Sequence, residues 1–503
     1  MKFYDIDNAL QEAINAADKP VRLKIEIDSG LGFYYGIFEQ DIIEANFYGL
    51  KETTGGTTAR GDFLLDNTIG IYAFSNVGAG SQVKVSFSLG DGLPYFQRFV
   101  FYVDDKGIQD IRGEGRKRYV YIGLRDLSEK LRKTDDARDW TSPAVFTYSV
   151  VCDKTQPEKS LVHGIAGRAG LTENDIDCST ISVTLPYVRL RRNVWAELSS
   201  LAAAYRCHLE CTPEKPLVFT HSPYQSEALL DDEIAHTFTG ENIFHLRKIS
   251  RTDLYRNTVR LKVNMPVSLG RQEIWRYDDP PVFYDEFLQP HYPFKYPLVR
   301  EIESSNYEAK YKIFDASSKE RNVIFADEID MKEEAENRLE YDGAFSYTHY
   351  DVTTNHDKAV LTLKKEADGD LYNATIHGRP IVLDLNRSCF MRDIKGVNTF
   401  GTIALNVTGS YFSDYGIEDK HGLSIPHYED WVKRELAERI MKRREFTVKT
   451  HKAVFNACVG ARVKIKMKND ESEGMINAFS FRYKRDAAFV ATFKIIETGG
   501  NNE

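Results

Sequence analysis

The sequence has few cysteines and no long apolar runs, and each absence argues against a class of protein. Its six cysteines are scattered along 503 residues, so no disulfide framework is indicated and a reducing compartment of synthesis is expected. No run of about 18 apolar residues occurs, which predicts that the chain makes no stable membrane insertion. Met1 is followed directly by Lys2 and Phe3, without an apolar signal segment, and this favours synthesis in a cytoplasm.

An excess of basic charge is also lacking. The chain carries 75 Asp and Glu against 66 Lys and Arg, for a formal net charge of −9. Proteins that grip nucleic acid through its phosphates are normally basic, so this balance argues against a nucleic-acid binder, including a sequence-specific one. It remains compatible with a wide pore that guides DNA by repelling it.

Aromatic residues are abundant, with 29 Phe and 28 Tyr, and aromatic side chains favour strands. Residues 21–27 alternate strictly between apolar and charged side chains, which is typical of a half-buried strand. Residues 28–30 form a turn signal, after which similar patterns recur. We therefore expect an antiparallel β barrel or sandwich over 19–127, with strands near 31–38, 43–52, 61–66, 82–89, 95–103 and 117–123.

The rest of the chain predicts a mainly β protein with an α+β middle region. Residues 1–18 fit a short amphipathic helix, and 128–142 fit a charged linker. The pattern divides the remainder into an α/β helix–hairpin domain (143–245), a β-rich middle region with an insertion (246–385), and a second barrel with a preceding helix (386–498). Within these we expect helices at 157–169, 192–205 and 427–443, a hairpin at 207–220, and strands near 445–450, 461–468, 474–483 and 488–496.

The second barrel is predicted from an internal repeat. Gly80, Val83 and Val85 recur as Gly460, Val463 and Ile465, numbered 380 residues later (460 − 80). Continued without a gap, the comparison places the aromatic strand of Phe99 and Phe101 opposite that of Phe479 and Phe481. Each copy would be a strand, a turn and an aromatic strand. Because repeats report architecture, we interpret these ten residues as the structural core of one barrel that occurs twice, although chance similarity between alternating strands is the alternative.

Several short segments, taken in order, resemble the baseplate hub or tail-tip proteins of tailed bacteriophages and related contractile injection systems. They include the strand that ends at Asn67, the segment that would close the first barrel, and a Trp-containing helix followed by a hairpin. None is a chemical signature, and 280–340 departs from the pattern. The segments are 60–67, 80–85, 99–103, 120–131, 195–202, 217–219, 436–444 and 460–466.

The resemblance implies a structural function. Hubs of this family are homotrimers in which two tail-tube-like antiparallel β barrels per chain give a pseudo-sixfold ring. The ring caps the tail tube, carries the central spike or fibre, and opens for passage of the tape measure protein and genome. The implied partners are therefore a distal tail or tail-tube ring protein, the tape measure protein and the spike or fibre. The implied location is the virion tail tip, after synthesis in the host cytoplasm.

Candidate catalytic and metal residues carry less weight. Cys207, His208 and Cys211 invite a zinc interpretation, but no second Cys or His pair lies at zinc-finger spacing. No Gly-x-Ser-x-Gly elbow and no His-Glu-x-x-His motif occurs. We therefore predict no enzyme activity, no metal and no cofactor, with a cell-wall hydrolase as the least favoured function.

An alternative function from another class is a receptor-binding or carbohydrate-binding tail adhesin. Aromatic side chains in loops can stack on sugars, and three segments are rich in them. These are 283–284, 292–296 and 347–350.

Overall fold

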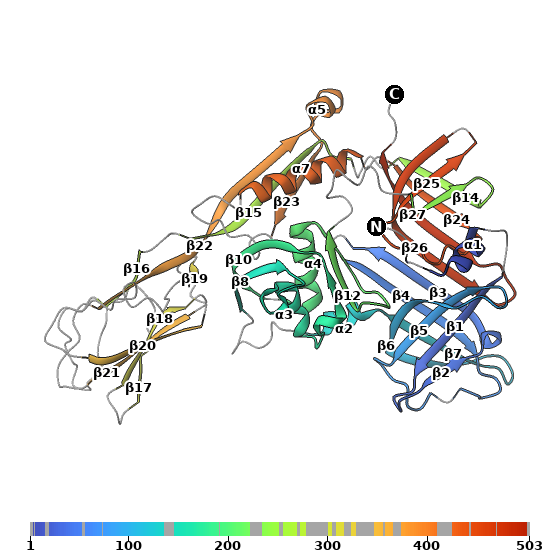
Figure 1. Cartoon of the computed structure of the whole chain (residues 1–503), viewed down its shortest axis with the longest axis horizontal. Coiled ribbons are helices and arrows are strands. Elements are labelled where there is room, and N and C mark those ends of the chain that lie inside the picture. Colours follow the sequence, from blue (N-terminus) through green and yellow to red (C-terminus); the bar gives the residue numbers. More distant parts are fainter. Residues whose placement is uncertain are drawn as a thin grey trace. The chain divides into compact units, whose positions relative to one another are not determined.

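A computed structural model describes most of the chain as two compact units, which are Met1–Arg260 with Phe390–Leu405 and Trp431–Glu503, and Leu261–Cys389 with Asn406–Asp430 (Figure 1). The described residues are 4, 6–15, 20–52, 56–72, 74–134, 145–190, 192–221, 234–250, 255–268, 272–277, 300–303, 308–315, 323–327, 347–355, 358–365, 374–409, 425–441, 444–468 and 470–499.

The first unit contains a 13-stranded sheet built from both ends of the chain. Its order is β14-β24-β27-β26-β3-β4-β7-β6-β5-β1-β2, and β25 pairs with β26 while β13 pairs with β25. In Figure 1 the blue N-terminal strands continue into the red C-terminal ones. The strands are β1 (Val21–Asp28), β2 (Tyr34–Ile37), β3 (Ile42–Lys51), β4 (Thr57–Asp66), β5 (Gln82–Leu89), β6 (Phe96–Arg112), β7 (Arg118–Arg125), β13 (His236–Thr239), β14 (Ile243–Ser250), β24 (Arg444–Thr450), β25 (Arg462–Met467), β26 (Asp470–Lys484) and β27 (Val490–Gly499).

Alternation of apolar and polar residues explains these strands. In β1 every second side chain is buried, from Val21 to Ile27, while Lys24 is exposed. The buried faces of the N-terminal and C-terminal strands form one common core. In it the rings of Phe87 and Phe455 stack with centroids 5.5 Å apart. The predicted mainly β class with an α+β middle region is thus confirmed, and the strands assigned to two separate barrels belong to one continuous sheet.

The helix–hairpin region lies between these strand groups in sequence. Its strands form two small sheets, of order β10-β8 and β11-β12-β9. Helix α4 begins where the Asn193 side chain accepts a bond from the Ala196 amide at 2.9 Å, and ends at left-handed Arg206. The elements are β8 (Val145–Cys152), α3 (Leu161–Gly167), β9 (Ile176–Cys178), β10 (Ile181–Arg189), α4 (Val194–Tyr205), β11 (Cys207–Glu210) and β12 (Leu217–His221).

Some elements differ from the sequence expectation. The predicted linker at 128–142 begins with helix α2 (Leu127–Lys133), because Asp126 caps it by accepting from the Ser128 amide at 3.1 Å. Helix α1 (Asn8–Asn15) is shorter than 1–18. Strands β13 and β14 fall in the predicted helix–hairpin and middle regions, yet they pair with β25 and β24 of the large sheet. The last long helix, α7 (Ile425–Met441), agrees with the expected 427–443.

The second unit is also built from strands. One sheet has the order β16-β22-β15-β23, with β19 on β22, and another has the order β17-β18-β21-β20. The strands are β15 (Thr258–Ser268), β16 (Gln272–Tyr277), β17 (Arg300–Glu303), β18 (Glu308–Asp315), β19 (Val323–Asp327), β20 (Tyr347–Asn355), β21 (Lys358–Lys365), β22 (Ala374–Arg392) and β23 (Ala404–Gly409). Helix α5 (Ile394–Phe400) follows β22 and belongs to the first unit. Among the helices of the described residues, none is long and apolar enough to cross a membrane.

Candidate functional site

The large sheet contains the same strand arrangement twice. Strands β4, β5, β6 and β7 follow one another in sequence but lie in the order β4-β7-β6-β5, and strands β24 to β27 lie in the order β24-β27-β26-β25. Strand β3 pairs with β4 as β14 pairs with β24. We call β1 and β3–β7 the first strand set, and β13, β14 and β24–β27 the second. One pairing differs, because β1 is antiparallel to β5 whereas β13 is parallel to β25.

Irregularities in the pairing also recur at matching places. A bulge interrupts β3 between Ile42 and Glu44 and interrupts β14 between Ile243 and His245. The pairing with the last strand of each set is also interrupted after Val103 in β6 and after Ile476 in β26, although the irregularity in β6 is the larger. Bulges are local features with a defined position, so their coincidence supports a duplicated fold rather than a chance likeness of strands.

The turns that precede β5 and β25 are nearly identical. In the first turn, the backbone amides of residues 77 and 81 donate to the carbonyls of residues 74 and 78. The amide of residue 80 donates to the carbonyl of 103, and the amide of 103 donates to the carbonyl of 81. The second turn repeats all four bonds, from the amides of 457, 461, 460 and 476 to the carbonyls of 454, 458, 476 and 461, respectively. Gly80 and Gly460 have φ values of +88° and +90°, a left-handed region that disfavours other residues. The sequence repeat at Gly80 and Gly460 therefore coincides with a repeated backbone structure.

The aromatic strands follow a different register from the ungapped sequence comparison. Val83 pairs with Phe101, whereas Val463 pairs with Gly474. Phe479 and Phe481 lie further along β26, beyond the part that pairs with β25, and face β3 instead. In this strand the structural repeat thus aligns Phe101 with Gly474, because the connection from Leu89 to Phe96 is longer than the one from Met467 to Asp470.

Eight of the ten residues of the predicted repeat form core rather than surface. Their aromatic rings stack in two pairs, with centroids 4.9 Å apart for Phe99 and Phe101 and 4.8 Å apart for Phe479 and Phe481. The two pairs meet, since the Phe99 and Phe479 centroids are 6.2 Å apart. The strand residues of the ten are buried, namely Val83, Val85, Phe99, Phe101, Val463, Ile465, Phe479 and Phe481. They can stabilise the strand sets but cannot contact a partner directly.

The two strand sets are joined by the antiparallel pairing of β26 with β3, from Ala478 opposite Leu50 to Lys484 opposite Glu44. We call this pairing the β26–β3 junction. Gly49 lies opposite Phe479, and a Cβ atom there would come within 2.4 Å of the phenyl ring. A glycine is therefore required for the ring to lie over the neighbouring strand. The sequence analysis missed this junction, because pairing between distant strands leaves no local pattern.

Arg98 connects the strand sets from inside the core. Its side chain is buried, and it donates to the carbonyl of Phe455 at 3.0 Å and to that of Ala457 at 2.8 Å. Its guanidinium also lies over the ring of Tyr4 at 4.3 Å from the centroid, a cation–π contact. The repeated turn of the second set is thus held by a side chain of the first.

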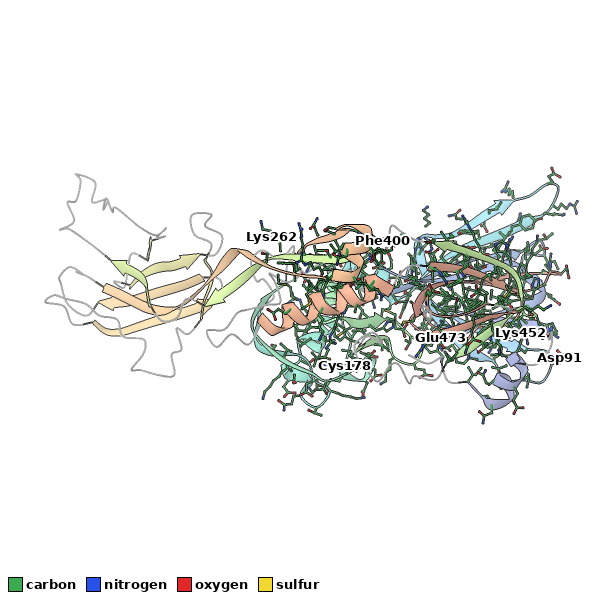
Figure 2. All side chains as sticks on the ribbon, turned by 90° about the horizontal axis from the view of Figure 1, so that it is seen from above. Asp91, Cys178, Lys262, Phe400, Lys452 and Glu473 are labelled. Atoms are coloured by element: carbon green, nitrogen blue, oxygen red, sulfur yellow. The ribbon has the colours of Figure 1, made fainter. Side chains whose placement is uncertain are left out.

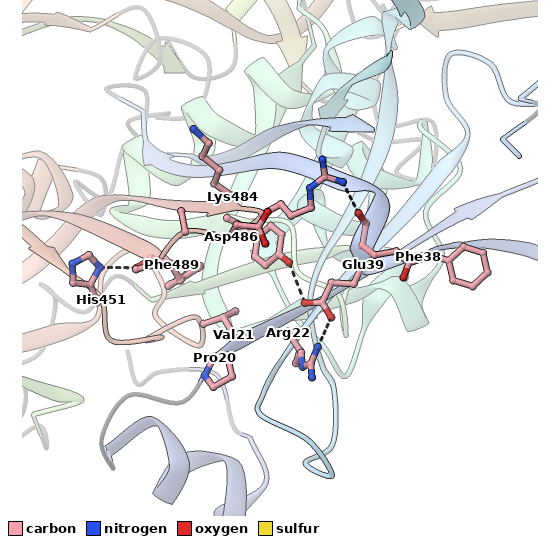
Figure 3. A pocket seen from close by; sticks show the side chains of 14 residues that line it. Pro20, Val21, Arg22, Phe38, Glu39, His451, Lys484, Asp486 and Phe489 are labelled. Atoms are coloured by element: carbon pink, nitrogen blue, oxygen red, sulfur yellow. Dashed lines mark hydrogen bonds and ion pairs between the residues drawn. The ribbon is translucent and has the colours of Figure 1, made fainter. Parts of the chain in front are cut away.

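A pocket of about 1020 Å³ lies where β1 and the short helix η1 (Glu39–Asp41) approach the turn between β26 and β27 (Figure 3). The Glu39 carboxylate accepts from Arg22 at 3.3 Å and from the Tyr483 hydroxyl at 3.2 Å. Burial and the nearby Glu39 carboxylate raise the pKa of Tyr483 to about 12, which keeps this hydroxyl a donor. Because these bonds cross from the first strand set to the second, the pocket belongs to their junction.

Three metal-ligating side chains come together at a place that the sequence analysis did not single out. Cys152, His163 and Cys178 have ligand atoms within 4.8 Å of one another in the helix–hairpin region, where Figure 2 labels Cys178. Burial lowers the pKa of His163, and the hydrogen bond between the two thiols lowers the pKa of Cys178 while it raises the pKa of Cys152. The raised pKa of Cys152 disfavours the thiolate that zinc binds, and structural zinc takes four protein ligands whereas this group has three.

The cysteines singled out from sequence do not form such a group among the described residues. Cys207 and His208 lie buried in β11, and His208 contacts Glu210 at 3.2 Å. Burial raises the pKa of Cys211, which disfavours the thiolate that a metal needs. The aromatic segments of the adhesin alternative at 283–284 and 292–296 lie outside the described residues, and 347–350 begins β20.

No family model and no curated protein matches the sequence, but solved structures match the fold. The tail protein from Neisseria meningitidis MC58 matches at a TM-score of 0.51 and 10% identity, over 95% of this chain and 97% of that one. The 43 kDa tail protein of prophage MuSo2 from Shewanella oneidensis matches at 0.49 and 10% identity, over 95% and 98%. The E. coli c3393 protein, described as a type VI secretion system component, matches at 0.39 and 9% identity, over 95% and 77%.

The chain therefore has the fold of a tail protein over nearly its whole length. The resemblance predicted from short sequence segments is confirmed at the level of the fold. Identity of 10% explains why only the order of those segments, and no extended motif, carried the signal.

Proposed function

We propose that this chain is the structural hub of a phage or phage-like tail tip or baseplate. Three copies form a pseudo-sixfold ring, in which each chain supplies two similar strand sets. The ring caps the tail tube, carries a central spike or fibre, and opens for genome passage. A threefold object with six similar units can sit both on a sixfold tube and under a threefold spike.

The observation that supports this proposal best is the duplicated strand set. Strand order, two bulges and the bonds of the turn before β5 and β25 all recur within one chain. With two similar strand sets in each chain, a ring of three chains has six similar units.

The remaining parts of the proposal concern partners and location. The proposed partners are a distal tail or tail-tube ring protein, the tape measure protein and the spike or fibre, and the proposed location is the virion tail tip. The mechanism is mechanical and electrostatic, without catalysis or cofactor. The net charge of −9 would help DNA pass without adhering.

The test is mass photometry and negative-stain electron microscopy of the purified full chain, alone and with its tail-tube partner. We expect particles of three chains whose class averages show six similar densities around an axis. Particles that remain single chains in both samples would contradict the ring. Six densities from six chains would contradict the pairing of two units per chain.

A further inference from the structure

The duplication shows which strands of the two sets correspond. Through the shared bulges, β3 corresponds to β14, with Ile42 matching Ile243. Strand β26 corresponds to β6, because both pair with the last strand of their set. Counted through β27 and β7, Phe479 matches Ile108 and Phe481 matches Asp110. The β26–β3 junction within one chain therefore has a counterpart that would join β6 to β14.

The edges needed for that counterpart are open in a single chain. Strand β5 pairs with β6 only as far as Tyr102, and the turn before β5 bonds Val103. From 104 to 112, β6 has β7 on one side and, within the described residues, no strand on the other. Within the part of the chain that the structure describes, strand β14 pairs only with β24 and ends the sheet. An open edge offers unpaired amides and carbonyls to another chain.

Both open edges carry an apolar side chain on the core face of the sheet. Ile108 and Leu246 are only partly buried, and both pack against the common core. These positions correspond to buried residues of the junction, since Phe479 matches Ile108 and Ala45 matches Leu246. The core face of the sheet therefore extends to both open edges, where a neighbouring strand could cover it.

We propose that β6 of one copy of this chain pairs antiparallel with β14 of the next copy, reproducing between chains the β26–β3 junction within each chain. The register follows when each residue of the β26–β3 junction is replaced by its counterpart in β6 or β14. It places residue 108 opposite 250, 109 opposite 249, 110 opposite 248, 111 opposite 247 and 112 opposite 246.

Charge agrees with this register. Asp110 comes opposite Lys248, a pair of opposite sign on the same face of the sheet. No pair in the register brings together two like charges. Because the two edges are different surfaces of one chain, their contact is head-to-tail and closes into a ring when the rotation permits. The proposal rests on the assembly proposed above and adds the strands and the register that form it.

Disulfide cross-linking of the full-length chain tests the register. Residues directly opposite in antiparallel strands have Cα atoms roughly 5 Å apart, which a disulfide spans. In the Gln109→Cys, Ile249→Cys double variant, mild oxidation should link neighbouring chains, giving covalent trimers on a non-reducing gel. Both positions lie at the open edges, so the substitutions leave the core intact.

The matched control is the Gln109→Cys, Lys248→Cys double variant, whose side chains would lie on opposite faces of the sheet. It should cross-link at least tenfold less, and each single variant should show only the background of the native cysteines. If the variants form three-chain rings but the 109/249 pair cross-links no better than 109/248, the register is overturned while the hub function stands. If all variants and the natural chain remain monomeric with the tail-tube partner, both proposals fail together.

Discussion

At the residue scale, Arg98 is the clearest case of one side chain holding distant parts of the chain together. Replacing it with methionine keeps much of its bulk but leaves the carbonyls of Phe455 and Ala457 buried without their donor. An orphaned buried acceptor costs about 1–3 kcal/mol. We therefore expect Arg98→Met to destabilise the turn at 454–461 locally by about 3 kcal/mol.

Hydrogen-exchange mass spectrometry measures this effect directly. A loss of about 3 kcal/mol corresponds to exchange roughly a hundredfold faster in peptides that cover 454–461. The control is Arg22→Met, because Arg22 makes its ion pairs at the partly exposed edge of the sheet, where such pairs are weak. Equal protection in both variants would show that Arg98 does not hold the turn.

A second residue-scale prediction concerns acid. Burial lowers the pKa of His236 in β13 to about 4, with the Lys452 charge as a smaller cause. The unfolded chain, with an ordinary imidazole of pKa about 6.5, binds more protons between these values, so folding weakens as the pH falls from 6.5 towards 4. At pH 5 the loss is about 2 kcal/mol. His236→Gln should abolish this part of the pH dependence.

Urea unfolding of the natural chain and of His236→Gln, compared at pH 7 and pH 5, measures the difference. Comparison between the variants matters because Asp126 acts in the opposite sense. Burial raises its pKa to about 6, so its contribution improves as the pH falls from 6 to 4. Parallel shifts of the urea midpoint in both proteins would contradict the role assigned to His236.

At the element scale, the strand pattern and the turns were predictable, and the register of the aromatic strands was not. Alternation gave β1 and β5 to within a residue, and the glycine repeat at Gly80 and Gly460 located equivalent turns. The comparison failed at Phe479 because the chain between β5 and β6 is longer than the chain between β25 and β26, which an ungapped comparison cannot detect. Helix α2 was missed because its capping by Asp126 is a single short-range bond in a charged stretch.

The repeated turns predict paired effects of mutation. Gly80→Ala and Gly460→Ala each force a side chain into a left-handed conformation, which costs about 1–2 kcal/mol. A Cβ atom at Gly80 would meet nothing within 4 Å, so the cost there is conformational rather than steric. We expect both variants to lower the urea midpoint of the sheet.

Gly78→Ala is the matched control for Gly80→Ala. It lies in the same turn, has ordinary φ, and also has open space around its Cα, so its midpoint should stay close to that of the natural chain. A Gly80→Ala variant no less stable than Gly78→Ala would mean that the turn tolerates a different backbone. The left-handed glycine shared by the two turns would then not be needed for their stability.

At the scale of the whole molecule, the sequence indicated a duplicated β architecture but not how the copies meet. The β26–β3 junction pairs residues near opposite ends of the chain, and no local pattern specifies such a pairing. Gly49 acts in the junction and Arg98 joins the strand sets elsewhere in the core, yet each is an ordinary residue of an alternating strand when seen in sequence. Tertiary pairing of this kind appears only when both partners are placed in space.

The same junction has a consequence for biosynthesis. Phe47 of β3 lies opposite Phe481 of β26, so 434 residues (481 − 47) must be translated before the pair can form. At roughly 5–20 residues per second, the first strand set waits some tens of seconds with an open apolar edge on the ribosome. During that interval, neighbouring nascent chains on one message compete for the edge that belongs to β26. Yield of folded protein should therefore depend on translation speed and ribosome spacing as much as on the stability of the finished sheet.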